Sequence, residues 1–173
     1  MNGTRFTRGA LSLVLALLLV SQAVACGIFP EDVVVSDARV QPLLKAAAAF
    51  DRTKYGFSPL PASGRVRLES TPRAGYDAML HLGGKTSRTI GFRKNASGYF
   101  WIGEQEIFHG PRTYTSVDGT FQEQITLTFE KEHVSGVPLN RLSIFYTGED
   151  SRLAGHSDLS SKDVKPILHE WGY

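Results

Sequence analysis

Cysteine is almost absent from this chain of 173 residues, in which Cys26 is the only one. Disulfide bonds within the chain are therefore excluded, and packing of the core must hold the fold together. The chain also lacks a Gly-x-Ser-x-Gly elbow and any HxH or HExxH spacing of its five histidines. The sequence thus gives no support to serine-nucleophile chemistry and predicts no metal site from histidine spacing.

Runs of positive charge are absent as well. The chain holds 19 Lys and Arg, and Arg5 and Arg8 in the first ten residues account for two of them. The 17 that remain balance the 17 Asp and Glu, all of which lie downstream. With no Lys/Arg-rich stripe, we expect no nucleic-acid partner and no electrostatic binding to anionic lipid.

The N-terminal segment has the pattern of an export signal. An apolar run over residues 11–20 follows Arg5 and Arg8, and Ser21-Gln22 separate it from Ala23-Val24-Ala25. This run is shorter than the roughly 20 apolar residues that cross a bilayer as a helix. Its position and its small terminal residues indicate a cleaved secretory signal.

Cys26 directly after this leader resembles the lipidation site of a bacterial lipoprotein. The resemblance covers residues 1–26 and implies that Cys26 becomes the lipidated first residue of the mature chain. It implies a stable membrane anchor, since two or more acyl chains hold a protein durably on a bilayer. Gly27 stands where an Asp would favour the inner membrane, which implies the outer membrane, facing the periplasm, in a Gram-negative source.

Two other fates of the leader stay open. Ala23-x-Ala25 also suits general signal peptidase, which would release a chain with a free thiol at Cys26. An uncleaved membrane anchor is the third reading. The lipoprotein reading explains the odd cysteine, and it divides the chain into a signal peptide (1–25), a lipidated N-terminus with a short tether (26–35) and one domain (36–173).

Two helices are predicted in that domain. Val40, Leu43 and Ala47 fall at helical spacing in a segment with Ser36 or Asp37 as its cap, Pro42 in its first turn and Gly56 at its end. Residues 160–171 predict a weaker C-terminal helix, in which Ser160 and Asp163 have capping-box spacing and Pro166 limits the helix or displaces its start.

The rest of the domain alternates with the period of a strand. Predicted strands cover residues 33–35, 66–68, 76–82, 87–94, 99–103, 105–108, 113–117, 121–130 and 142–146. Short turns join them, among them Asp118-Gly119 and Gly136-Val137-Pro138, and Gly103 is a candidate bulge. We therefore predict an α+β, mainly β domain, with an antiparallel meander sheet that forms a partial barrel or a sandwich.

Two groups of residues could carry chemistry. Gly84-Lys85-Thr86 matches the end of a phosphate loop, but Met79 stands where that motif needs glycine, so we interpret these residues as a hairpin turn. Glu104, Glu106 and His109 could form a metal or acid/base group. His109 has the wrong strand parity, however, so surface carboxylates beside a turn histidine are the favoured interpretation.

Aromatic residues gather around one hairpin. The group comprises Tyr99, Phe100, Trp101, Phe108 and Tyr114. Core filling is the simplest explanation, and the alternative is that some of these rings reach an outer face and bind a sugar, a lipid or a partner.

No residue pattern in 27–173 indicates a known family, and no cofactor is predicted. The main hypothesis is a lipid-anchored cell-envelope protein that acts as a binding or structural module near the membrane, with an envelope protein or a glycan as partner. One alternative is an envelope hydrolase that uses surface carboxylates such as Glu104 and Glu106. The other is a lipocalin-like carrier of a small apolar ligand, which requires a closed barrel with an apolar cavity.

Overall fold

The computed structural model describes residues 29–70, 75–132 and 138–173. The leader, Cys26, the histidine at position 133 and most of the predicted turn at 136–138 lie outside these ranges. Among the helices of the described residues, none combines the length and apolar character needed to cross a membrane.

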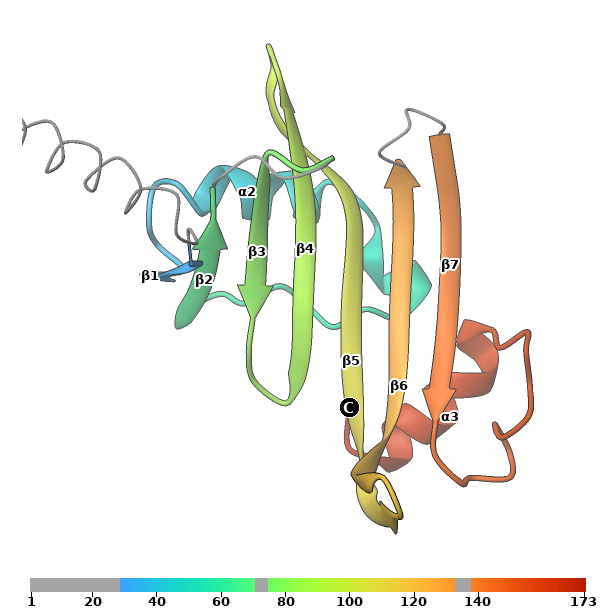
Figure 1. The fold of residues 1–173 in the computed structure, drawn as a ribbon. Coiled ribbons are helices and arrows are strands. Elements are labelled where there is room, and N and C mark those ends of the chain that lie inside the picture. Colours follow the sequence, from blue (N-terminus) through green and yellow to red (C-terminus); the bar gives the residue numbers. More distant parts are fainter. Residues whose placement is uncertain (1–28, 71–74, 133–137) are drawn as a thin grey trace, which may run out of the picture.

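Seven antiparallel strands form one open sheet in which each strand pairs with its neighbours in sequence, as the predicted meander requires (Figure 1). The strands are β1 (Glu31–Val34), β2 (Arg65–Glu69), β3 (Ala78–Leu82), β4 (Thr86–Asn95), β5 (Gly98–Ser116), β6 (Gly119–Glu132) and β7 (Pro138–Thr147). The prediction of a mainly β fold with an antiparallel meander is confirmed. The sheet is curved but not closed, so the described residues do not form the barrel that a lipocalin-like carrier would need.

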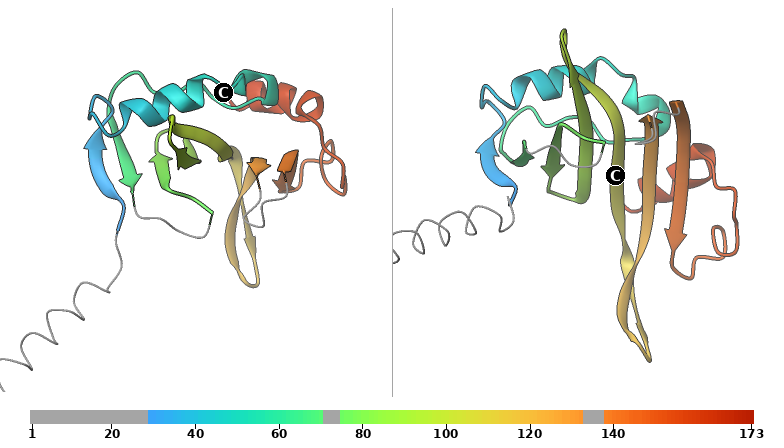
Figure 2. Two further views of the ribbon diagram at one scale, coloured as in Figure 1. Left: turned by 90° about the horizontal axis from the view of Figure 1, so that it is seen from above. Right: turned by 45° about the horizontal axis from the view of Figure 1, so that its top comes forward.

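Both helices lie along one face of this sheet, which we call the inner face (Figure 2). They are α2 (Gln41–Ala48) and α3 (Ser161–Glu170), with the short 3-10 helix η1 (Arg52–Tyr55) between α2 and the first long loop. The opposite face, here called the outer face, carries no helix of the described residues (Figure 2).

Local details of the helices differ from the prediction. Val40, and not Ser36 or Asp37, is the residue that caps α2, and no side chain bonds to the first turn. Gly56 ends η1 in a left-handed conformation, φ 90°, whereas α2 already ends at Ala48. The capping box of α3 is formed as predicted, but Pro166 lies inside the helix without ending it.

The core fills the space between the inner face and the helices. Alternate residues of the strands point into it, among them Leu80, Ile90, Phe108, Ile125 and Leu127, all essentially inaccessible to solvent. The alternation predicted for residues 121–130 is confirmed on β6 for the buried Ile125, Leu127 and Phe129, whereas Phe121 is exposed. The strands predicted over 99–117 form a single strand, β5, whose irregularities interrupt its register without ending it.

A bulge in β5 lies beside the glycine predicted to form one. Gly91 of β4 pairs with Gly103, and the next residue, Phe92, pairs with Trp101, so Ile102 is the extra residue. An extra residue shifts the side-chain alternation by one. As a result Trp101 and Glu104, three positions apart, both face the core.

Candidate functional site

Polar side chains form a straight row across the outer face. Arg67, His81, Thr89, Gln105, Thr128 and Ser143 are each the direct register partner of the next, from β2 to β7. Each alternates with buried inner-face residues of its own strand, so all six belong to the outer face. We call these six residues the polar row.

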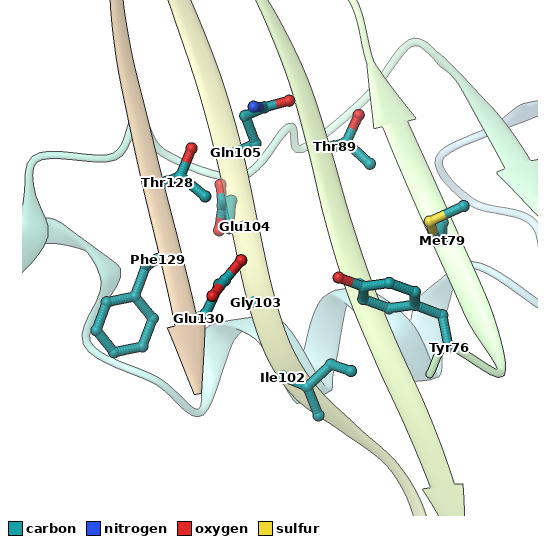
Figure 3. A pocket seen from close by; sticks show the side chains of 11 residues that line it. Tyr76, Met79, Thr89, Ile102, Gly103, Glu104, Gln105, Thr128, Phe129 and Glu130 are labelled. Carbon is teal, nitrogen blue, oxygen red and sulfur yellow. The ribbon is translucent and has the colours of Figure 1, made fainter. Parts of the chain in front are cut away.

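A hollow of about 270 Å³ lies along one side of the polar row, over β3 to β6 (Figure 3). Gly91 and Gly103 face each other in its floor, and we call it the glycine hollow. Tyr76 lies so close to Gly91 that a Cβ there would fall 2.2 Å from the ring carbon Cε1. A side chain at position 91 would therefore displace the ring, and glycine permits the ring to lie across β4.

The walls of the glycine hollow combine apolar and polar groups. Tyr76, Met79 and Ile102 supply apolar surface, and Glu130 of β6 lies across from Tyr76 (Figure 3). Burial raises the pKa of the Tyr76 hydroxyl, and the negative charge of Glu130 raises it further. The phenol is therefore neutral at physiological pH and can donate a hydrogen bond.

Three polar side chains at the hollow have no partner of their own. Within the described residues Gln105, Thr128 and Glu130 make no side-chain hydrogen bond and no ion pair. Gln105 and Glu130 are exposed and Thr128 is half-buried. Together they present an amide, a hydroxyl and a carboxylate beside an aromatic ring, which is a set of groups suited to a polar ligand with an apolar face.

A second hollow, of about 410 Å³, adjoins the first at Thr89 and is here called the basic hollow. Arg65 and Arg67 of β2 line it together with Asp32, His81 and Ser87. Arg67 is exposed and has no ion-pair partner in the part of the chain that the structure describes.

His81 is held in place between two strands. Its Nδ1 lies 3.2 Å from Oγ1 of Thr89, and its Nε2 lies 3.5 Å from Oε2 of the buried Glu69. These contacts fix the orientation of the imidazole in the middle of the polar row.

The two carboxylates predicted at the surface lie in the core. Glu104 is 3% exposed and Glu106 is fully buried, so the interpretation of surface carboxylates is wrong. Both point to the inner face of β5, under η1 and the loop that follows it. Arg52 of η1 binds Glu104 through two hydrogen bonds, of which the Nε–Oε2 bond is 2.7 Å.

Glu106 and Arg88 connect this buried cluster to the loop that follows η1, although Nε of Arg88 has no hydrogen-bond partner within the described residues. Glu106 accepts from the backbone N–H of Ser58 at 2.8 Å and from the hydroxyl of Thr86 at 2.7 Å. Arg88 donates to the carbonyls of Ser58 and Pro59 and lies within 4 Å of both carboxylates. The cluster therefore ties the covering loop to the sheet.

Burial dominates the electrostatics of this cluster. It raises the pKa of Glu104 above the ordinary value, although Arg52 and Arg88 act in the opposite direction. It lowers the pKa of Arg88, against the effect of the two carboxylates. Since all four charged groups are buried and paired with one another, they have a structural role, and the hydrolase interpretation loses the surface carboxylates on which it depends.

His109 does not join Glu104 and Glu106. Its backbone N–H and carbonyl bond to the hydroxyl of Tyr173, and its side chain has the opposite parity to theirs, as predicted. No group of three or more potential metal ligands occurs among the described residues.

The aromatic group belongs largely to the core. Trp101 is 3% exposed and stacks on Phe50 at 4.2 Å and on Phe129 at 5.2 Å between ring centroids. Phe108 is buried too, whereas Tyr99 is half-buried and packs against the core. Core filling is thus confirmed for Trp101 and Phe108.

Gly84 and Lys85 lie in the hairpin connection between β3 and β4, as the turn interpretation predicted, and Thr86 is the first residue of β4. The ammonium group of Lys85 donates to the carbonyl of Gly172 at 3.2 Å, which fastens the hairpin to the C-terminus.

Sequence reasoning missed the residues of the outer face. The period of two predicted over residues 121–130 separates the two sides of β6, but it does not single out Thr128. The register between strands does so, because it brings residues from six strands into one row. Tyr76 and Gly91 carried no local signal at all.

Comparison of the chain with models of protein families, with curated proteins and with solved structures gave no match.

Proposed function

We propose that this protein is a lipid-anchored binding module of the cell envelope that takes its ligand on the outer face of the sheet. The observation that carries the proposal is the contrast between the two faces. Helices and a paired ionic cluster close the inner face, whereas the outer face presents the polar row and the glycine hollow without a covering element among the described residues.

The anchor in this proposal is Cys26, at the end of the export signal. Only two described residues, Phe29 and Pro30, precede β1, so a lipid on Cys26 would hold the domain close to the bilayer. Phe29 is 83% exposed and would lie next to the membrane surface in this arrangement.

The anchor is tested by the intact mass of the mature protein. A mass increased by a diacylglyceryl group on Cys26 is expected, with or without a third acyl chain. Cys26→Ser should then release the protein from membranes. An unmodified Cys26, or a Cys26→Ser chain that stays with the membrane after a salt wash, would contradict the anchor.

The binding face is tested separately, with the anchor removed. The Cys26→Ser chain is added to isolated cell envelopes, and the bound fraction is compared with that of the same chain carrying Thr128→Trp. The indole should fill the glycine hollow, which Thr128 lines, without entering the core. We expect it to lower binding at least tenfold.

Lys45→Trp is the matched control, because Lys45 is exposed on α2, on the other side of the molecule. It should leave envelope binding unchanged. Equal binding by Thr128→Trp and Lys45→Trp, with both chains folded by circular dichroism, would show that the outer face is not the binding face.

A further inference from the structure

We infer that the ligand of the outer face is a linear saccharide chain that lies across the strands along the polar row. The inference rests on the proposed function, since it names the class of ligand for the same face. It is carried by the spacing of the row, by the chemistry of the groups beside it and by the position of the two hollows.

The polar row repeats at a regular interval. Neighbouring strands lie about 4.8 Å apart, so six side chains on six strands span roughly 24 Å. A chain of linked sugar rings presents hydroxyl groups at a repeat of similar length, set by the size of one ring. A saccharide lying perpendicular to the strands can therefore meet a new hydrogen-bonding side chain at each ring.

The groups beside the row match the two surfaces of a sugar ring. The C–H face of a ring is apolar, and the half-buried Tyr76 and Met79 offer apolar surface in the glycine hollow. The edge of a ring carries hydroxyls, for which Gln105 and Glu130 hold unused donors and acceptors. Because the Tyr76 ring lies over Gly91, that ring, rather than the bare strand, is the surface that a sugar ring would meet.

The two hollows set a direction along the row. The basic hollow at β2 holds Arg65 and Arg67, and the glycine hollow at β6 holds the carboxylate of Glu130. An acidic substituent on the saccharide is stabilised near Arg67 and repelled near Glu130. A chain with a carboxylate at one end should therefore bind in one orientation, with that end over β2.

Other macromolecules fit this face less well. A peptide that adds a strand needs a free sheet edge, and the row lies in the middle of the face. A nucleic acid needs a continuous basic surface, which Glu130 interrupts. An acyl chain needs an apolar channel, whereas the row itself is polar.

The test measures binding of defined saccharides to the purified, full Cys26→Ser chain by isothermal titration calorimetry. The probes are cellotetraose, tetraacetylchitotetraose and tetragalacturonate, with glucose as the single-ring reference. We expect at least one four-ring probe to bind, and glucose to bind at least tenfold more weakly. Thr128→Trp should abolish binding of that probe.

A milder variant protects the test against a folding defect. Gln105→Ala removes one hydrogen-bonding group from an exposed position and should weaken binding about fivefold, the equivalent of one net hydrogen bond. Gln122→Ala is its control, since Gln122 is exposed near the β5–β6 turn, away from the row. It should bind with unchanged affinity.

The direction along the row is tested with Arg67→Gln and with a cellotetraose derivative that carries a single carboxylate, on one terminal ring. Arg67→Gln should weaken binding of this acidic probe by a larger factor than it weakens binding of neutral cellotetraose. Equal effects on both probes would overturn the orientation.

Three outcomes overturn the saccharide inference. They are no binding of any four-ring probe at millimolar concentration, equal affinity for glucose and the four-ring probes, and equal effects of Gln105→Ala and Gln122→Ala. If Thr128→Trp still removes envelope binding in that case, the outer face is the binding face and its ligand belongs to another class. If it does not, the proposed function fails as well.

Discussion

The two faces of the sheet both carry polar and charged residues, but within the described residues these are paired on the inner face, and several are unpaired at the glycine hollow of the outer face. On the inner face Glu104 and Arg52 are buried and bonded to each other, and their contacts attach η1 to β5. On the outer face Gln105 and Glu130, on the same and the next strand, have no such partners within the described residues. A polar group that is satisfied inside the protein stabilises the fold, whereas an unsatisfied group at the surface is available to a ligand.

Aromatic residues on the two faces also differ in their surroundings. Trp101 has the core on every side, so its removal leaves a cavity. Tyr76 has the sheet on one side and the glycine hollow on the other. Substitutions on the two faces test whether inner-face residues stabilise the fold and outer-face residues do not.

Trp101→Ala should have the largest effect. Loss of the stacked contacts with Phe50 and Phe129 should lower the free energy of unfolding by about 4 kcal/mol, as for other large aromatic residues in cores. Urea denaturation measures this value. Tyr76→Ala, the corresponding change on the outer face, should lower the free energy of unfolding by about 1 kcal/mol. Equal losses in the two variants would show that the two faces contribute alike to stability.

Arg52→Met should come next, with a loss of about 3 kcal/mol at neutral pH. The substitution leaves Glu104 buried with only the more distant Arg88 beside it, and an uncompensated buried charge is strongly destabilising. The pKa of Glu104 is raised by burial already, so in this variant the stability should recover as the pH is lowered and the carboxyl takes up a proton.

Two controls accompany that measurement. Arg39→Met removes exposed ion pairs with Glu31 and Asp37 and should leave the free energy of unfolding nearly unchanged. Arg52→Met combined with Glu104→Gln should regain part of the loss at neutral pH and should not respond to mild acid. If Arg52→Met alone is as stable as the parent chain, the buried ionic cluster does not hold η1 and the following loop on the sheet.

Asp150→Asn should have a smaller effect that depends on pH. Hydrogen bonds from Arg152, which also binds Glu170 of α3, lower the pKa of Asp150 to about 2. A carboxyl with a lowered pKa contributes stability above its unfolded value of 3.8, and this contribution is lost as the pH falls toward 2.

Urea denaturation at several pH values between about 4 and 2 checks this prediction. The parent chain should lose stability more steeply in that interval than Asp150→Asn, with a difference of about 1 kcal/mol at neutral pH. Parallel curves for the two proteins would rule out a contribution from this carboxyl.

Gln105→Ala should have the smallest effect on stability. Its side chain is exposed and has no partner in the described structure, so the free energy of unfolding should change by less than about 0.5 kcal/mol. A large loss of stability in this variant would mean that the polar row stabilises the fold, as the buried residues of the inner face do.

Local patterns predicted most of the elements. The period of two over residues 121–130 predicted the strand, and Asp118-Gly119 placed the turn before it to within one residue, since Val117 and Asp118 form that turn. The capping residues of α3 marked its start. The predicted cap of α2 was wrong because backbone turns at Asp37 and Val40 lead into the helix without a side-chain cap.

The burial of Glu104 and Glu106 could not be predicted from such local patterns. Alternation assigned them to one side of a strand, but a pair of carboxylates is normally a sign of the solvent side. Only the partners explain their burial. Arg52 lies 52 positions before Glu104, and Ser58 lies 48 positions before Glu106.

The sequence by itself determined the class of fold, a meander of strands with two helices and without disulfide bonds within the chain, and it predicts an export signal that ends at Cys26. These properties follow from local composition and from periods of two and 3.6 residues. Tertiary structure alone decided which face is closed and which residues share the other. The position of η1 over Glu104 and the register of six strands depend on contacts between distant segments, and no local pattern encodes them.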